Sequence, residues 1–268
     1  MMDLTRPWPE FSFVAFDTET SGAYAVGFEI VEFGAVKWKD GAVVDRLQFL
    51  LKPREPMSDF IIGIHGITND MVANAMLMPE KVHEIKKFFS GSLLIAHHAA
   101  FDLGFLAYDF EKSHIPFPEE PVLCSSLLSQ KLIHGVKNHK LQNLIQEFNL
   151  QGGAAHRAED DAYSCLQVAL MCFEKMPPGA TIQEILKIQE KVYYWNRFSI
   201  LSLNQNWHRN LMEAILAKRN IEILYKKQMR SVFPLGIVRT VDGDYLSAIC
   251  QRDCQRKRFY LIEIKDAM

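Results

Sequence analysis

Apolar and polar residues follow two different periods over the first 176 residues. Short apolar runs rich in β-branched and aromatic residues predict strands at 12–16, 29–39, 42–51, 93–96 and 122–124. Longer segments with apolar residues on one side predict helices at 69–90, interrupted by Pro79, and at 101–112, 125–132, 141–149 and 158–175. Asp40-Gly41 is a hairpin-turn signal between the second and third strands. Antiparallel strands followed by alternating helices and strands predict a mixed α/β layer architecture.

The best domain boundary in the chain is Met176-Pro177-Pro178-Gly179, which ends the last of these helices. Beyond it, Thr181 with Glu184 three residues later predicts a capping box and a helix to about residue 198. There follow a polar loop at 202–210, a helix at 211–219 and strands at 221–225, 232–239, 245–250 and 259–264, with a hairpin turn at Asp242-Gly243. We therefore divide the chain into residues 1–176, a linker and helix at 177–207, and a small β-rich domain at 208–268.

Composition narrows the class of protein. Of 268 residues, 49% are hydrophobic and 23% are charged, which excludes intrinsic disorder and leaves a chain able to bury a core. The first twelve residues form no signal peptide, and about 18 successive apolar residues occur nowhere, so we expect a cytoplasmic protein with no membrane partner. Five cysteines without a CxxC pair argue against a disulfide framework and a structural zinc site.

The formal net charge of −2 hides an uneven distribution. Residues 208–268 contain 12 lysines and arginines against seven acids, whereas the other 207 residues contain 18 against 25. A basic C-terminal part suits an anionic ligand or nucleic acid, whereas an acidic body that handles nucleic acid needs metal ions to bridge its carboxylates to phosphate. The alternative is that these are two ordinary solvated surfaces of opposite sign.

Carboxylates occur at three places where predicted elements begin or end. Asp17 and Glu19 follow the first apolar run, and residues two apart in an extended chain project to the same side. Two like charges held together repel unless a cation neutralises them, and Mg²⁺ or Mn²⁺ prefers such oxygen ligands, although the same residues also suit a turn. Asp102 opens a helix, where an acid also suits the helix dipole. Asp161 lies near the start of the helix at 158–175, after His156 in the preceding loop, and is expected to face Asp17 across the sheet.

Taken together, three segments resemble the exonuclease motifs of the DEDDh family. They are Asp17-Thr18-Glu19-Thr20, the segment 96–102 that ends in Asp102, and the segment 156–161 with His156 and Asp161. The family consists of 3′→5′ exonucleases and includes the epsilon proofreading subunit of bacterial DNA polymerase III. The resemblance covers roughly residues 10–175 and implies a ribonuclease H-like fold with a mixed five-stranded sheet.

The resemblance also implies roles for the motif residues. Two Mg²⁺ or Mn²⁺ ions would be held by Asp17, Glu19, Asp102 and Asp161, with Asp17 contacting both ions. His156 would act as the general base, because an imidazole titrates near neutral pH and can accept a proton from water.

Further matches concern the nucleic-acid end. Thr18, Thr20 and His65 would contact the terminal nucleotide, and Phe101 would stack against its base, with core packing as the alternative for Phe101. His98 occupies a position where the family usually has Asn. A neutral imidazole can still hydrogen-bond there, but its geometry differs, which leaves rate and substrate preference open.

Residues 208–268 resemble a WYL domain, a small SH3-like β module of bacterial regulators. The segments that carry the resemblance are 211–215, 223–225, 234–238, 245–246 and 258–264. Asp244 replaces the Trp of the name, and Glu263 replaces an Arg before the final Ile. The resemblance implies that this domain binds nucleic acid or a nucleotide-like ligand through one face, here with Arg230, Tyr245, Arg256 and Arg258. A structural or dimerising role is the alternative.

The sequence thus predicts a metal-dependent 3′→5′ exonuclease that hydrolyses single-stranded or frayed DNA to nucleoside monophosphates. One alternative is an RNA exonuclease that trims short oligonucleotides. Another is a ligand-responsive regulator that uses an inactive nuclease fold as a scaffold, although no helix-turn-helix candidate precedes residue 208. The sequence leaves the sugar preference, the ligand of the C-terminal domain and the oligomeric state open.

Overall fold

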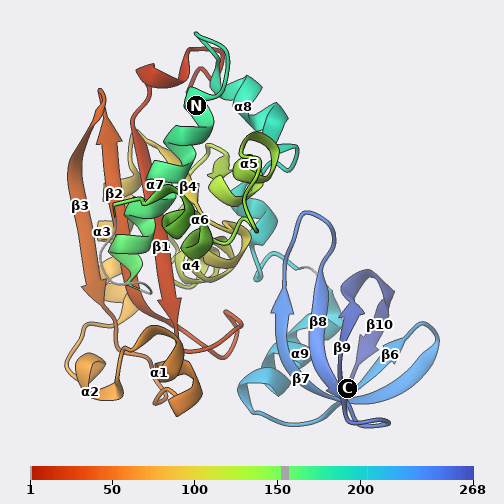
Figure 1. Ribbon diagram of the computed structural model, residues 1–268. Coiled ribbons are helices and arrows are strands. Elements are labelled where there is room, and N and C mark those ends of the chain that lie inside the picture. The colour runs from red at the N-terminus through yellow and green to blue at the C-terminus, as the bar shows by residue number, and fades with distance from the viewer. Residues whose placement is uncertain (1, 152–156, 204) are drawn as a thin grey trace.

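The computed structural model describes residues 2–151, 157–203 and 205–268, and these form two units, each built on a five-stranded sheet (Figure 1). The first sheet has the order β3-β2-β1-β4-β5 and confirms the predicted mixed sheet. Its strands are β1 (Phe13–Thr20), β2 (Ile30–Lys39), β3 (Ala42–Leu50), β4 (Leu93–Ala96) and β5 (Val122–Cys124). Strand β2 runs antiparallel to both of its neighbours, β1 and β3, whereas β4 and β5 run parallel to β1.

Strand β1 lies at the centre of this sheet because both of its sides are apolar. Phe13 and Ala15 point into one buried cluster with residues of α7, and Val14 and Phe16 point into another with residues of α3 and α4. The strand is longer than predicted and continues to Thr20, because β2 pairs with it along this whole length. Asp17 and Glu19 therefore lie within the strand, where the pleat fixes their direction.

Helices cover both faces of the first sheet. The helices of this unit are α1 (Asp59–His65), α2 (Asn69–Val72), α3 (Met78–Phe89), α4 (Ala100–Lys112), α5 (Ser125–Leu132), α6 (Leu141–Phe148), α7 (Ala158–Glu174) and α8 (Ile182–Gln189). The predicted helix at 69–90 is wrong in its middle, because Pro79 lies in the first turn of α3, where a missing N–H is tolerated, and does not interrupt a longer helix. Helix α1 has no counterpart in the prediction.

The segment after the predicted boundary differs from expectation in one way. The capping box is confirmed: Thr181 Oγ1 accepts from the Glu184 backbone N–H at 3.2 Å, and the Glu184 carboxylate accepts from the Thr181 N–H at 2.8 Å. The helix does not reach residue 198, because α8 ends where Glu190 takes a positive φ of 64°. A separate 3₁₀ turn, η2 (Trp195–Phe198), follows.

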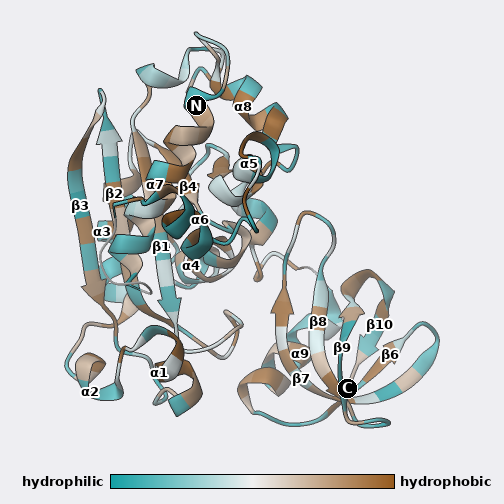
Figure 2. Cartoon of the chain, in the orientation of Figure 1, coloured by the Kyte–Doolittle hydropathy of each residue, from teal (hydrophilic) through white to brown (hydrophobic). Residues whose placement is uncertain are grey.

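The C-terminal unit is an antiparallel sheet with the order β10-β6-β7-β8-β9. Its elements are α9 (Asn206–Leu216), β6 (Ile221–Tyr225), β7 (Gln228–Val238), β8 (Tyr245–Cys250), β9 (Gln255–Tyr260) and β10 (Ile264–Ala267). Helix α9 begins inside the predicted polar loop. Figure 2 shows most of β9 in the hydrophilic colour.

The predicted single strand at 259–264 is wrong. Strand β9 ends at Tyr260, the 3₁₀ turn η3 (Leu261–Glu263) follows, and β10 joins the opposite edge of the sheet. Four residue steps from Tyr260 to Ile264 span at most about 14 Å, so the two edges lie close and the sheet is strongly curled.

A continuous buried cluster joins the two units. It runs from Phe16 and Phe89 of the first unit through Trp195 and Phe198 to Ile237 of the second sheet. The Glu111 carboxylate of α4 accepts from the backbone N–H groups of residues 200 and 201 at 2.9 and 3.2 Å. Within the described ranges, no helix combines the length and the apolar character needed to cross a lipid bilayer.

Candidate active site

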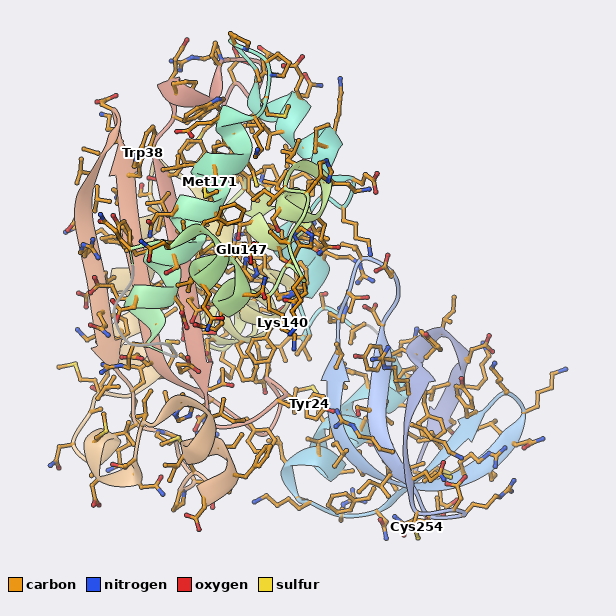
Figure 3. The ribbon with its side chains drawn as sticks, in the orientation of Figure 1. Tyr24, Trp38, Lys140, Glu147, Met171 and Cys254 are labelled. Carbon is orange, nitrogen blue, oxygen red and sulfur yellow. The ribbon has the colours of Figure 1, made fainter. Side chains whose placement is uncertain are left out.

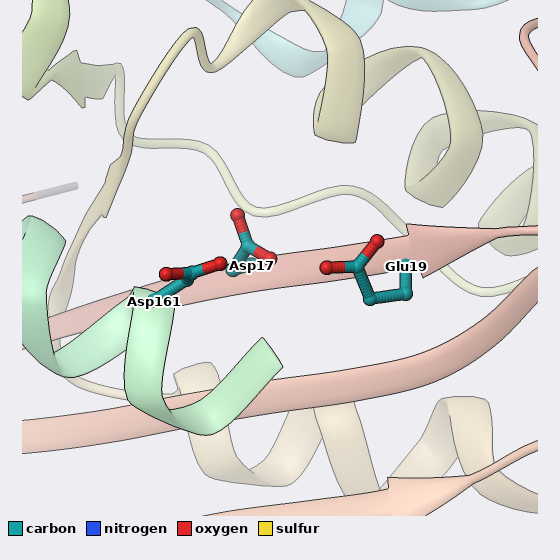
Figure 4. A group of neighbouring side chains, drawn as sticks. All are labelled: Asp17, Glu19 and Asp161. Carbon is teal, nitrogen blue, oxygen red and sulfur yellow. The ribbon is translucent and has the colours of Figure 1, made fainter. Parts of the chain in front are cut away.

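Three carboxylates meet at the end of the central strand (Figure 4). Asp17 and Glu19 project from the same side of β1, and Asp161 approaches from the first turn of α7. One oxygen from each of the three lies within 4.8 Å of the others. Asp161 is buried, whereas Asp17 and Glu19 keep part of their surface accessible. The arrangement offers oxygen ligands to a divalent cation and leaves one side open.

A glycine explains how α7 comes this close to β1. Gly34 of β2 pairs with Asp17, and a Cβ at Gly34 would lie 2.1 Å from the Ala158 carbonyl carbon and from the Glu159 nitrogen. Only a residue without a side chain lets the start of α7 lie directly on the strand. Sequence analysis missed Gly34, although a lone glycine inside an otherwise apolar strand is a signal of close backbone approach.

An ion pair between the buried Glu32 and the partly exposed Arg157 anchors the same helix start. Glu32 of β2 is fully buried and accepts from the Arg157 guanidinium at 2.7 and 3.1 Å and from the Ala158 backbone N–H at 3.0 Å. On the other side, Gln142 of α6 donates to Asp161 Oδ1 at 3.0 Å. Sequence analysis missed Glu32 and Gln142, because their role depends on contacts between distant segments.

Asp102 completes the acidic group from the opposite side. It is buried near the start of α4, and the Thr18 hydroxyl donates to its Oδ1 at 2.7 Å. Asp102 is not one of the three residues whose oxygens lie within 4.8 Å of one another.

The acids raise one another's affinity for protons. Burial raises the pKa of Asp17 well above its ordinary value, and the charges of Asp102, Glu19 and Asp161 raise it further. Burial and the neighbouring acids raise the pKa of Glu19 to about 8, and burial raises the pKa of Asp102 to about 7. Such a group holds protons at neutral pH unless cations replace them, so the chemistry of these donors fits divalent metal ions.

The predicted hydroxyl contacts to substrate are already engaged within the protein. The Thr18 hydroxyl donates to Asp102 Oδ1, and the Thr20 hydroxyl donates to the Gly22 carbonyl at 2.7 Å. These bonds shape the end of β1 and the loop after it. His65 is buried at the end of α1, where its Nδ1 accepts from the Ile67 backbone N–H at 3.0 Å. His156 lies outside the described residues.

His98, between β4 and α4, and Phe101, in the first turn of α4, lie at the surface. His98 has a φ of 60°, a conformation that Asn and Gly adopt most easily. Its Nε2 lies 3.5 Å from Ser126 Oγ. The neighbouring His97 is buried and bonds Ser125 Oγ at 2.8 Å, and burial lowers the pKa of His97 to about 4, so it is a neutral structural residue. Phe101 is 43% exposed and adjoins Asp102.

The four expected ligand-binding residues of the C-terminal unit do not share one face. Arg258 pairs with Ser247 and Arg256 with Ile249, so both arginines lie on the same side of the sheet as Tyr245, and Arg258 stands 4.9 Å from the centre of the Tyr245 ring. Arg230 pairs with the buried Ile223 and lies on the opposite side, which corrects the expectation for this residue. Side chains alternate between the two sides along each strand, so the register between β7, β8 and β9 decides which residues share a side. The sequence alone does not give that register.

Comparisons with known proteins agree with this geometry. Residues 14–169 match the family model RNase_T, described as Exonuclease. A DNA polymerase III PolC-type of Caldanaerobacter subterraneus is 32% identical over 228 residues, which cover 81% of this chain and 16% of the relative. A PolC-type polymerase of Halalkalibacterium halodurans is 36% identical over 156 residues, which cover 58% of this chain and 11% of the relative. The chain thus spans only a small part of the length of these relatives.

Solved structures show the same fold. Exonuclease X in complex with 5′ overhanging duplex DNA is 26% identical, with a TM-score of 0.51 over 66% of this chain and 99% of that chain. A product-bound exonuclease I is 12% identical, with a TM-score of 0.56 over 94% of this chain and 63% of that chain, so the likeness of fold extends into the C-terminal unit. The chain therefore belongs to the RNase_T exonuclease family, whose DEDDh members are 3′-exonucleases dependent on divalent metals, and residues 14–169 are its exonuclease domain.

Proposed function

We propose that this chain is a metal-dependent 3′→5′ exonuclease that hydrolyses single-stranded or frayed DNA to nucleoside monophosphates. The observation that carries the proposal is the meeting of Asp17, Glu19 and Asp161 within 4.8 Å, beside the buried Asp102. DNA is favoured because the relatives include PolC-type DNA polymerases and an exonuclease X bound to DNA. A DEDDh nuclease domain bound to rAMP shares the fold at 18% identity, which keeps RNA as the competing substrate.

Different residues of the site have separate roles in hydrolysis. Asp17, Glu19, Asp102 and Asp161 would hold two Mg²⁺ or Mn²⁺ ions. When bound, such a pair of ions stabilises charge on the phosphate and leaving oxygen and lowers the pKa of the attacking water. Gln142 orients Asp161 through its hydrogen bond, and Thr18 orients Asp102. His156 accepts the proton of the water, since a neutral imidazole can do so near pH 7.

Residues 208–268 form an accessory domain, with residues 177–207 as its connection to the exonuclease domain at 1–176. We propose that this domain is an SH3-like, WYL-like module that binds nucleic acid or a nucleotide-like ligand. Support comes from its excess of basic residues and from Arg256, Arg258 and Tyr245 on one face of the curled sheet. Cations beside an aromatic ring suit a chain of phosphates and bases.

A gel assay with purified protein tests the proposal. A 5′-labelled single-stranded DNA and its RNA counterpart are incubated with Mg²⁺, with Mn²⁺ and with EDTA. A ladder shortened from the 3′ end, dependent on metal and stronger with DNA, is expected. A stronger ladder with RNA would assign the RNA exonuclease. Intact substrate in every lane, with protein that unfolds cooperatively, would overturn the enzyme and favour a ligand-responsive regulator.

A further inference from the structure

A shallow hollow lies where the two units meet, with about 50 Å³ of space inside it and about 370 Å³ once its open mouth is counted. The residues that line it include Tyr24 of the β1–β2 loop, Phe101, Gly104 and Phe105 of α4, Phe198 of η2, Val238 at the end of β7 and Arg239 just after it. Its walls are mainly aromatic and aliphatic, and because one side is open to solvent, a flat group can lie against them.

The C-terminal unit holds one wall of the hollow in place through Tyr24, which Figure 3 shows at the junction of the units. The Tyr24 ring lies on Gly236, where a Cβ would come within 2.2 Å of the ring. The Tyr24 hydroxyl donates to Ser247 Oγ at 2.8 Å and accepts from the Arg256 guanidinium. A loop that follows the active-site strand is therefore fixed by contacts to the second sheet.

The hollow adjoins the acidic site. Phe101 lines the hollow and directly precedes Asp102, and Ala23 lines it three residues after the end of β1. On the far side, the Arg256 guanidinium lies 5.6 Å from the centre of the Tyr24 ring, and Arg258 and the Tyr245 ring continue along the same face of the sheet. The order of features is therefore carboxylates, aromatic hollow, and then arginines beside tyrosines.

That order matches the chemistry of a single nucleic-acid strand. Metal-binding carboxylates suit the scissile phosphate, an aromatic hollow suits the flat face of an unpaired base, and arginines suit the phosphates that follow. We propose that the hollow at the junction binds an unpaired base of the substrate strand, upstream of the nucleotide that is removed. The inference rests on the proposed function and extends it, because it makes the C-terminal unit a wall of the substrate site.

Gly104→Leu tests the proposal by filling the hollow. Gly104 lies within α4, a Cβ there has no neighbour within 4 Å, and leucine is a better helix former than glycine, so the variant is expected to fold. Gly104→Ala is the matched control, because it makes the same change of helix propensity but adds only a methyl group to the hollow.

Two measurements separate the hollow from the catalytic centre. The first is hydrolysis of thymidine 5′-p-nitrophenyl phosphate with Mn²⁺, which needs only the metal site and one nucleotide. The second is binding of single strands of about eight nucleotides that carry 2-aminopurine at one position each, with Ca²⁺ to suppress cleavage. Stacking in the hollow is expected to quench one internal position in the wild type. Gly104→Leu is expected to abolish that quench and to weaken binding about tenfold, with ester hydrolysis changed less than about twofold.

The outcomes are distinguishable. Equal binding and an equal internal quench in wild type and Gly104→Leu, with normal unfolding of both, would overturn the hollow as a base site. Loss of ester hydrolysis by Gly104→Leu would show that the change reaches the metal site and would also overturn it. If the wild-type protein hydrolyses neither the ester nor DNA, the proposed exonuclease activity is wrong. The 2-aminopurine quench would still show whether the hollow binds a base.

Discussion

The two five-stranded sheets of this chain place charge in opposite ways. In the first sheet, acids gather at the end of a central strand whose two faces are covered by helices, and their pKa values are raised by burial and by one another. In the second sheet, Arg256 and Arg258 project from β9, an edge strand. Buried like charges need counterions within the protein, whereas arginines on an edge strand are open to an anion from solution.

The difference implies that the two sheets would contact a polyanion in different ways. The first sheet can approach phosphate only with divalent cations between them, and the second can approach it directly. Tyr24 connects the two surfaces, since its loop begins at the acidic strand and its ring ends on the second sheet.

The largest effect is expected from a substitution at Asp17, in the acidic site. Asp17→Asn keeps the shape of the side chain but removes its charge, so cleavage of single-stranded DNA should fall below about one per cent of the wild-type rate. Quantified gel ladders at saturating Mn²⁺ measure this. Asp45→Ala, at an exposed acid on β3, is the control and should keep full activity. Retention of a tenth of the activity by Asp17→Asn would refute the assignment.

The contact between α7 and β2 should be the next most sensitive. Gly34→Ala places a methyl group against the backbone of residues 158 and 159, so α7 must shift, at a cost of about 1–3 kcal/mol in the free energy of unfolding. The shift also moves Asp161, and activity should fall with stability. Denaturant unfolding and the gel assay check both effects. Gly63→Ala, in helix α1 with open space around its Cβ, should leave stability unchanged or raise it by up to about 1 kcal/mol. Equal stability of the two variants would contradict the close contact.

The metal-free protein should lose stability as the pH rises. The folded-state pKa values of Glu19 and Asp102 are raised, to about 8 and about 7, so the folded state binds more protons than the unfolded state between about pH 4 and pH 8. The stabilisation is fully present below the ordinary carboxyl pKa and is lost as the pH passes the raised values. Thermal unfolding in EDTA should therefore show a lower midpoint at pH 8.5 than at pH 5.5.

Divalent cations and a charge deletion sharpen the same experiment. Mg²⁺ or Mn²⁺ should restore the midpoint at pH 8.5, because the ions bind the deprotonated carboxylates of the folded state. Asp17→Asn should show a shallower dependence on pH in EDTA, because one of the like charges is gone. An unfolding midpoint that changes with neither pH nor metal would contradict a coupled acidic site.

The smallest effect is expected on the second sheet. Arg258→Ala should weaken binding of single-stranded DNA a few-fold and reduce the slope of log affinity against log salt by about 0.7, the value for one phosphate contact on a single strand. Fluorescence anisotropy at several salt concentrations, with Ca²⁺ in place of Mg²⁺, measures it. Arg230→Ala removes the same charge from the opposite side of the sheet and should leave affinity nearly unchanged. Equal losses in both variants would show that only net charge matters.

Local pattern was enough to predict much of the first unit. Apolar runs identified its five strands, and the period of two predicted that Asp17 and Glu19 project to one side. The Thr181 capping box was also predictable, because both of its hydrogen bonds lie within one helical turn. These features depend on neighbouring residues, whose spacing the sequence states directly.

Features that depend on contacts between distant segments were missed or wrong. The position of Arg230 relative to Arg258 follows from the pairing of β7, β8 and β9, and the break between β9 and β10 follows from the curl of the sheet. The sequence places Pro79 inside a longer helix, whereas α3 begins just before it. That start depends on how the preceding segment packs, which local pattern does not show.

The sequence by itself determined which residue types form the acidic site and in which order they occur. Only the tertiary structure decided that Gly34 lets α7 reach β1, that Glu32 and Arg157 anchor this helix, and that Tyr24 joins the active-site loop to the second sheet. The physical reason is that these contacts join residues separated by more than 100 positions. Their energies come from close packing and hydrogen-bond geometry, which no local pattern of hydrophobic and polar residues records.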